Sequence, residues 1–460
     1  MNLTDAARAM SGTVDGDDAA FLGVSTDSRN VAPGELFVAL RGERFDGHDF
    51  AGAARERGAA AAVTDLAGAV KLRASKVDLP LVVVADTRAA LGELAAAWRS
   101  RFALPVIGVT GSNGKTTSKE MIAAILRAAF GADSVLATAG NRNNDIGLPL
   151  TLLGLGEEHR AAVIEMGMSH PGEIAALARI VRPTVALVTN AQRAHLEGMG
   201  TLGRIALEKG AIFAELEENG VAVFGADDPW AGLWRSLSAR CRRLCFSLGG
   251  EAEVRGRCAT HGLENHVVIE SGGERIEVDL QLPGAHNARN ALSAAAAALA
   301  IGAPLAAVRQ GLMDFHGIPG RLQCRAGVHG ARVLDDAYNA NPDSLRAAID
   351  VLAAHPGRKI LVLGDMGEIG EAGGQFHDEI GGYAKSQGVD RLLAIGESSA
   401  LAAKNFGTGG EHFGRFEELA AALLGELTPE TIVLVKGSRF MRMERVLAII
   451  TAPEDGGAPS

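Results

Sequence analysis

Apolar runs separated by helical stretches dominate the middle of the chain. The first run is followed by a stretch at 119–130 whose apolar residues recur at helical spacing. Strands that are apolar throughout and alternate with helices are typical of a parallel sheet covered on both faces. The pattern therefore predicts an α/β domain whose strands are VIGV at 106–109, AAVIEM at 161–166, TVALVT at 184–189 and VAVFG at 221–225.

A second alternating series begins near residue 331 and predicts another parallel sheet, in a Rossmann-like C-terminal domain. Its strand candidates are ARVLDD at 331–336, KILVLGDM at 359–366, RLLAIG at 391–396 and TIVLVKG at 431–437.

Upstream of the central strands, short apolar runs at 36–40 and 81–85 flank an alanine-rich helix around 50–57. These indicate a small α/β N-terminal domain. We therefore expect three domains, at 1–86, 87–319 and 320–460.

The length agrees with three domains, because 460 residues at roughly 150 per domain give about three. Apolar residues make up 47% and charged residues 22%, as in a globular protein. Only the tail after Ala452 is predicted to be disordered. The weakly polar stretch 291–308 is cut by Gly302 and Pro304, so it predicts two packed helices and no membrane insertion.

The charge pattern argues against a nucleic-acid partner, because the net charge is -10 and no basic run occurs. Residues 1–13 lack a cationic segment leading into an apolar one, so we expect no secretory signal and a cytoplasmic location. The four cysteines, without metal-ligand spacing, are expected to be reduced thiols: Cys241, Cys245, Cys258 and Cys324.

The sequence VIGVTGSNGKTT at 106–117 reads as a strand, a glycine-rich turn and the start of a helix. Such a turn directs backbone N–H groups and a helix N-terminus at one anion. Lys115 is placed to reach the β and γ phosphates of ATP, and the Thr116 hydroxyl to bind magnesium. The strict pattern has glycine five residues before Gly114, where this chain has Val109. An ordinary glycine turn is the alternative.

A phosphate loop alone leaves kinases, motors, transport subunits and ligases open. Ten motifs distinguish among these classes, because they occur along the chain in the order found in the Mur ligases, which the sequence therefore resembles. They are TGSNGKTT (110–117), GNRNNDIGLPLTLL (140–153), VIEMGMSHPGEI (163–174), AHLEGMG (194–200), EKGAIF (208–213), PGAHNARNAL (283–292), PGRLQ (319–323), LDDAYNANPDS (334–344), LGDMGE (363–368) and VKGSR (435–439).

The resemblance implies a metal site at the carboxyl edge of the central sheet. Glu165 and His195 match the family's metal ligands and, with Thr116 and phosphate oxygens, would hold two magnesium ions. A strand-end carboxylate and a loop histidine are the alternatives. Lys209 matches the family lysine that carbon dioxide converts to a carbamate. From this sequence alone, a helix-surface lysine beside Glu208 would be the default interpretation.

The resemblance also implies which residues bind ATP and which bind the UDP-linked substrate. The implied catalytic residues are Lys115, Lys209, His195 and Arg321. The implied ATP-binding residues are Gly111, Ser112, Asn113, Gly114, Lys115, Thr116 and Thr117 of the loop, Asn287 and Asn290 for adenine, Arg321 for the phosphates and Asp336 for the ribose. Helix capping is the alternative for the two asparagines. The implied UDP-substrate residues are Ser28, Arg29, Asp46, His48, Asn141 and Asn144.

The implied reaction is ATP-dependent joining of D-alanyl-D-alanine to UDP-N-acetylmuramoyl-tripeptide through an acyl phosphate. Either lysine or diaminopimelate is compatible as the third peptide residue, and we expect a monomer. The nearest alternative is the ligase that adds the third amino acid, which usually carries Asp-Asn-Pro-Arg where this chain reads GDMGEIG. Folylpolyglutamate synthetase shares the phosphate loop without a UDP module. An ATP-binding regulatory or transport subunit is the alternative from another class.

Overall fold

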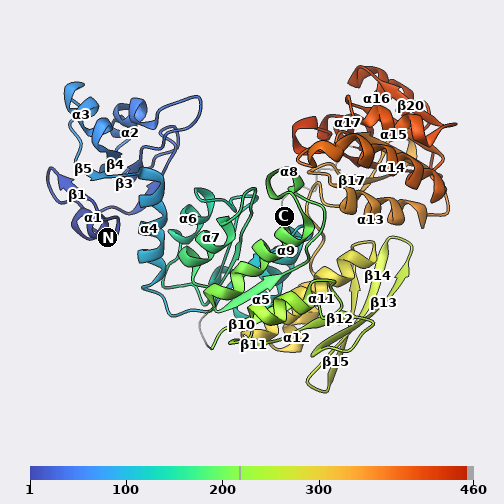
Figure 1. Ribbon diagram of the computed structural model, residues 1–460, viewed down its shortest axis with the longest axis horizontal. Coiled ribbons are helices and arrows are strands. Elements are labelled where there is room, and N and C mark those ends of the chain that lie inside the picture. Colours follow the sequence, from blue (N-terminus) through green and yellow to red (C-terminus); the bar gives the residue numbers. More distant parts are fainter. Residues whose placement is uncertain (217–218, 453–460) are drawn as a thin grey trace, which may run out of the picture.

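The computed structural model describes residues 1–216 and 219–452. The chain forms three α/β units, and the N-terminal and C-terminal units lie on opposite sides of the central one (Figure 1). This confirms the predicted fold class. The predicted disordered tail, 453–460, lies outside the described residues. None of the described helices combines the length and apolar composition needed to cross a bilayer.

The N-terminal unit has a five-stranded sheet of order β1-β5-β4-β3-β2, parallel except for β1. The predicted helix around 50–57 is present, and two further helices flank the sheet. The elements are α1 (Leu3–Ala9), β1 (Thr13–Asp15), β2 (Gly23–Ser25), β3 (Glu35–Val38), η1 (Gly47–Phe50), α2 (Ala51–Glu56), β4 (Ala61–Asp65), α3 (Leu66–Ala74) and β5 (Leu81–Val84).

The central unit is built on a six-stranded, fully parallel sheet of order β11-β10-β9-β6-β8-β7. All four predicted strands are present. The elements are α4 (Thr87–Arg99), β6 (Val106–Thr110), α5 (Lys115–Phe130), η2 (Ala132–Ser134), β7 (Val135–Ala137), α6 (Gly147–Leu152), β8 (Ala161–Glu165), α7 (Glu173–Val181), β9 (Val185–Val188), α8 (Leu196–Met199), α9 (Leu202–Gly210), η3 (Ala211–Glu215), β10 (Val221–Phe224), α10 (Ala231–Leu237) and β11 (Arg242–Arg243).

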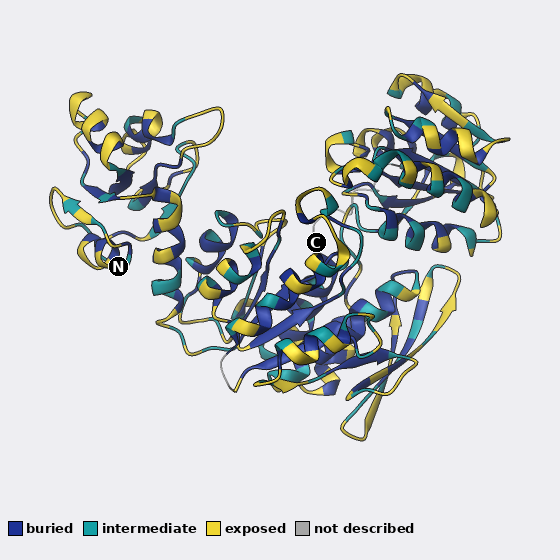
Figure 2. Cartoon of the chain, in the orientation of Figure 1, coloured by how far each residue is buried: buried dark blue, intermediate teal, exposed yellow. Residues whose placement is uncertain are grey.

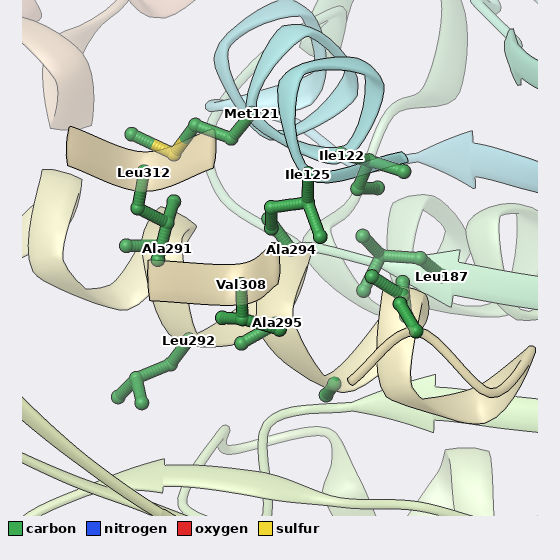
Figure 3. Close-up of a cluster of buried hydrophobic side chains, with 14 of the residues drawn as sticks. Met121, Ile122, Ile125, Leu187, Ala291, Leu292, Ala294, Ala295, Val308 and Leu312 are labelled. Atoms are coloured by element: carbon green, nitrogen blue, oxygen red, sulfur yellow. The ribbon is translucent and has the colours of Figure 1, made fainter. Parts of the chain in front are cut away.

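Successive strand residues point to opposite faces of this sheet, so its inner strands contribute side chains to two hydrophobic cores, one on each face. Ile107 and Leu187 pack against helices on one face, where Ile125 and Ala294 meet (Figure 3). Val106 and its neighbours pack on the other face against α6, α7, α9 and α10. The inner strands β6, β8, β9 and β10 are consequently buried along their whole length, as the dark ribbons at the centre of Figure 2 show.

A second, four-stranded sheet follows the parallel one and was not predicted. It consists of β12 (Phe246–Leu248), β13 (Val254–His261), β14 (Glu264–Ser271) and β15 (Glu274–Leu280), and β13 to β15 are antiparallel. Its inner face packs on α11 (Ala285–Ala300), which is followed by α12 (Leu305–Met313). These last two are the helices predicted for 291–308.

The C-terminal unit has a six-stranded sheet of order β16-β17-β21-β18-β19-β20, parallel except for β16. All four predicted strands are present. The elements are β16 (Gln323–Ala326), η4 (Val328–Gly330), β17 (Arg332–Asp336), α13 (Pro342–Ala353), β18 (Arg358–Gly364), η5 (Gly370–Ala372), α14 (Gly373–Ser386), β19 (Arg391–Ile395), α15 (Ser399–Phe406), β20 (Gly410–Phe413), α16 (Phe416–Leu424), β21 (Thr431–Lys436), η6 (Arg439–Met441) and α17 (Glu444–Ile450).

Candidate active site

A cavity of about 990 Å³ lies where the central and C-terminal units meet. Predicted site residues from both units line it, namely Ser112, Asn113, Gly114, Lys115, Thr116, Thr117, Asn141, Asn144, Glu165, His195, Asn287, Asn290, Arg321 and Asp336. Gly111 and Lys209 lie outside its lining, as do the four predicted residues of the N-terminal unit.

The glycine loop joins β6 to α5 through four residues, 111–114. Gly111 and Gly114 have φ values of 151° and 79°, which favour glycine. A Cβ at Gly111 would stand 1.8 Å from Thr189 Oγ1, and one at Gly114 would stand 2.3 Å from Asn290 Oδ1. Val109 is a fully buried residue of β6, so the departure from the strict pattern lies in the strand and leaves the loop itself intact.

The loop after β9 supports the glycine loop. Asn190 accepts from Asn113 N at 3.0 Å and donates its amide to Asn113 O at 2.9 Å. Ser112 Oγ donates to Gln192 O at 3.0 Å and accepts from Gln192 N at 2.9 Å. These bonds fix the backbone before any ligand is present, which lowers the entropy lost on binding an anion.

Two cations meet beside this loop. Lys115 Nζ donates to the carbonyls of Gly111 and Ser112, at 2.9 and 3.2 Å. Burial lowers the pKa of Lys115; Glu165 opposes this effect, and Arg321 reinforces it. Arg321 donates to Thr116 Oγ1 at 3.2 Å. The two cations raise the positive potential at the loop, which suits a polyphosphate.

Glu165 is the last residue of β8, and its carboxylate is held in one orientation. Asn143 donates its amide to Oε1 at 2.7 Å, and the Glu165 N–H donates to Thr138 Oγ1 at 3.0 Å. Oε2 is buried and has no hydrogen-bond partner among the described residues. A buried carboxylate oxygen without a partner is costly, and a bound cation would offset that cost.

His195 lies at the N-terminal end of α8 with a φ of 58°. Its Nδ1 stands 2.7 Å from Glu368 Oε2, across the boundary between the two units. The contact meets the distance of a hydrogen bond but not its direction, and among the described residues Nδ1 has no other partner. The proximity of His195 lowers the pKa of Glu368.

Lys209 is fully buried near the end of α9, so the helix-surface interpretation is wrong. Within the described residues its Nζ makes no hydrogen bond. Burial lowers the pKa of Lys209 well below its ordinary value, and the nearby Lys115 lowers it further. Glu208 instead accepts from Gly172 N and Ile174 N, each at 2.8 Å, and holds the start of α7.

The two predicted adenine contacts lie at the start of α11. Asn287 donates to Pro283 O at 2.9 Å, and Asn290 donates to Asn287 Oδ1 at 3.2 Å. Gly284 is the N-cap of this helix and no side chain caps it, so the capping interpretation is wrong. The bond to Asn287 positions the Asn290 amide beside Gly114 of the glycine loop.

On the opposite wall, Asp336 ends β17, and its side chain is 13% exposed. It forms an ion pair with Lys436, with 2.5 Å between Oδ2 and Nζ, and accepts from Leu322 N at 3.0 Å. Burial raises the pKa of Asp336, and Lys436 opposes that rise.

The predicted residues of the N-terminal unit lie outside this cavity. Arg29 is exposed and paired with Asp27 at 2.8 Å, and Ser28 lies between them in sequence. Asp46 accepts from His48 N at 3.1 Å and lies 2.5 Å from His48 Nδ1. The His48 ring is buried and supports the fold of this unit.

Several contacts between the central and C-terminal units were not predicted from the sequence. Arg193 donates its backbone N–H and its guanidinium to Asp343 of α13, with distances of 2.8 Å from N and 3.0 Å from Nε. Asn341 donates to Asn113 Oδ1 at 2.7 Å. No local pattern signals a pair 150 residues apart, whereas Asn143 was detectable from its position between Asn141 and Asn144.

Comparisons with known proteins agree with this arrangement. Three family models match the chain: the Mur ligase family catalytic domain at residues 21–99, the Mur ligase middle domain at 109–298 and the Mur ligase glutamate ligase domain at 320–439. The UDP-N-acetylmuramoyl-tripeptide–D-alanyl-D-alanine ligase of Escherichia coli K12 is 41% identical over 454 residues, covering 97% of each chain.

Solved structures give the same result. A crystal structure of MurF from Acinetobacter baumannii has a TM-score of 0.89 at 34% identity and covers 97% of both chains. The MurF ligase of Thermotoga maritima in complex with ADP has a TM-score of 0.79 at 28% identity and covers 93% of this chain and 96% of that one. On the matched family models and the long, highly covered relatives, the chain belongs to the Mur ligase family.

Proposed function

We propose that this protein is an ATP-dependent amide ligase that joins D-alanyl-D-alanine to UDP-N-acetylmuramoyl-tripeptide in peptidoglycan precursor synthesis. The observation that carries the proposal is the single cavity lined by the glycine loop on one side and by Arg321 and Asp336 on the other. The high identity to the Escherichia coli ligase of that name over nearly the whole chain supports the choice of substrates.

In this proposal the terminal carboxylate of the tripeptide takes the γ-phosphoryl group of ATP, and ADP leaves. The dipeptide amine then attacks the acyl phosphate, so that phosphate leaves, the amine loses a proton and the amide bond forms. Lys115 leaves its loop carbonyls to contact the phosphates, and Arg321 neutralises charge from the opposite wall. Because two anions must approach each other in the first step, these cations matter more than a protein nucleophile.

We propose two magnesium ions bound through Thr116, Glu165 and His195. The unpartnered, buried Oε2 of Glu165 supports this assignment. The described residues contain no cluster of three His, Cys, Asp or Glu side chains, so phosphate oxygens would complete the coordination. When bound, magnesium would supply positive charge against the phosphate oxygens.

We also propose that Lys209 is carbamylated. Attack on carbon dioxide requires a neutral amine, and burial favours the neutral form of Lys209. The nitrogen forms a bond to the carbon of carbon dioxide and releases one proton, which leaves a carbamate anion. That anion would face the positive charge of Lys115, whereas the ammonium form is repelled by it.

The remaining assignments complete the proposal. Residues 1–86 would bind the UDP end of the substrate through Ser28, Arg29, Asp46 and His48, with Asn141 and Asn144 further along; 87–319 would bind ATP; and 320–460 would bind the dipeptide. Asn287 and Asn290 would contact adenine, and Asp336 the ribose. We place the reaction in the cytoplasm, where the four free thiols would stay reduced.

Phosphate release tests the function directly. The purified protein with ATP and magnesium should release phosphate at an appreciable rate only when both the UDP-linked tripeptide and D-alanyl-D-alanine are present. Equal release without them would favour a regulatory or transport ATPase. Release with a UDP-linked dipeptide and a diamino acid would favour the ligase that adds the third residue.

A further inference from the structure

The C-terminal unit contacts the loop that carries His195 on both sides of that residue. Arg193, two residues before His195, binds Asp343 of α13. Just after His195, Glu197 N donates to Glu368 O at 3.4 Å. The Glu368 carboxylate itself lies 2.7 Å from His195 Nδ1. The segment from 193 to 197 therefore takes its position partly from another domain.

The two nitrogens of the His195 ring have different surroundings. Nδ1 is buried, and Glu368 is the carboxylate beside it. Nε2 makes no hydrogen bond with the described residues and is not buried. It is therefore accessible from the cavity that His195 lines. A neutral imidazole carries one proton, and a carboxylate beside Nδ1 keeps that proton there. The lone pair of Nε2 then faces the cavity.

We infer that Glu368 is a positioning residue that orients His195 for the cation, so that docking of the C-terminal unit completes the metal site. The inference rests on the proposed magnesium site. When the C-terminal unit moves away, Glu368 leaves with it, and the His195 ring loses the partner that selects its tautomer. Cation affinity thereby depends on the position of a domain that supplies none of the proposed protein ligands.

The test measures metal affinity instead of turnover. Mn²⁺, a paramagnetic substitute for Mg²⁺, is titrated by electron paramagnetic resonance into protein holding a non-hydrolysable ATP analogue. Glu368→Ala should raise the Mn²⁺ Kd about tenfold or more, as loss of an outer-shell partner does elsewhere. Glu368→Gln should raise it less, because an amide oxygen placed beside Nδ1 also favours a proton on that nitrogen.

Two controls separate positioning from damage. Glu371→Ala removes an exposed carboxylate three residues away that forms no hydrogen bond or ion pair within the described chain, and should leave the Mn²⁺ Kd unchanged. Affinity for the analogue in the presence of a chelator should not weaken in Glu368→Ala. Since the Glu368 side chain is 61% exposed, that variant should fold normally.

A second variant, His195→Ala, separates the positioning role of Glu368 from the proposed magnesium site itself. If His195→Ala weakens Mn²⁺ binding and Glu368→Ala does not, Glu368 has no positioning role and the magnesium site stands. If neither variant weakens it, both the site at His195 and the inference are wrong. We expect the double variant to bind Mn²⁺ no more weakly than His195→Ala; additive losses would show that Glu368 acts independently of His195 and would overturn the inference.

Discussion

The Arg193–Asp343 pair should hold the C-terminal unit against the central one, and Asp343→Ala removes it. The guanidinium and the carboxylate are 24% and 22% exposed, between a surface pair and a buried one. Exposed pairs contribute up to about 1 kcal/mol, and hydrogen bonds to charged groups about 1.5–3 kcal/mol. Because Asp343 accepts from both the backbone N–H and the guanidinium, we expect about 2 kcal/mol, or roughly a thirtyfold shift toward the undocked form.

Asp343 also lies in the first turn of α13, where its charge stabilises the helix by about 0.3–1 kcal/mol. A double-mutant cycle with Arg193→Ala removes this contribution, along with that of the backbone N–H, which alanine retains, and leaves the energy of the contact between the guanidinium and the carboxylate. Docked populations are measured by energy transfer between dyes on the central and C-terminal units, with solution scattering as an independent check. ATP affinity should fall along with docking, because ATP is proposed to contact both sides.

Ligand binding should shift the same equilibrium between docked and undocked forms. ATP with the UDP-linked substrate should favour the docked form and lower the radius of gyration of Asp343→Ala toward that of the parent protein. A coupling energy below about 0.5 kcal/mol, which is the usual error of additivity, would refute the claim that this pair holds the domains together. So would an unchanged docked population in Asp343→Ala.

Three further predictions concern single side chains. Lys115→Ala should abolish ligation, because its charge neutralises the transferring phosphoryl group. The free energy of unfolding should fall by no more than about 3 kcal/mol, because two hydrogen bonds to loop carbonyls are lost while a buried charge is removed; unchanged turnover would contradict the assignment of the loop. Lys209→Ala should be nearly inactive and regain activity with short carboxylates that replace the carbamate, and full activity without them would contradict carbamylation. Burial, with Lys436 nearby, lowers the pKa of His286 from 6.5 to about 4 in the folded protein. Between pH 6.5 and 4 the unfolded state therefore binds a proton that the folded state does not, and stability falls as the pH is lowered through this range. His286→Gln should therefore reduce the acid-side loss of thermal stability, by up to about 3 kcal/mol, and an identical pH profile would show that His286 does not titrate as described.

Local patterns predicted most of the fold correctly. The inner strands of the central and C-terminal sheets, such as β6 and β21, are buried on both faces, so continuous apolar runs mark them. The four-stranded sheet was missed because one of its faces is exposed. In β14 only Asn265, Val267 and Ile269 are buried along one side, and such a short alternating stretch is easily read as a loop.

The sequence by itself determined the glycine loop, the order of the family motifs and the edge of the sheet at which Glu165 and His195 lie. Each of these depends on residues close together in the chain or on the rule that parallel strands end at one edge. Only the tertiary structure decided that Lys209 is buried, that Glu165 Oε2 lacks a hydrogen-bond partner among the described residues, and that Glu368 lies beside His195. These properties arise from the packing of elements far apart in sequence, because burial and contact depend on what surrounds a side chain in space, and no local periodicity encodes that.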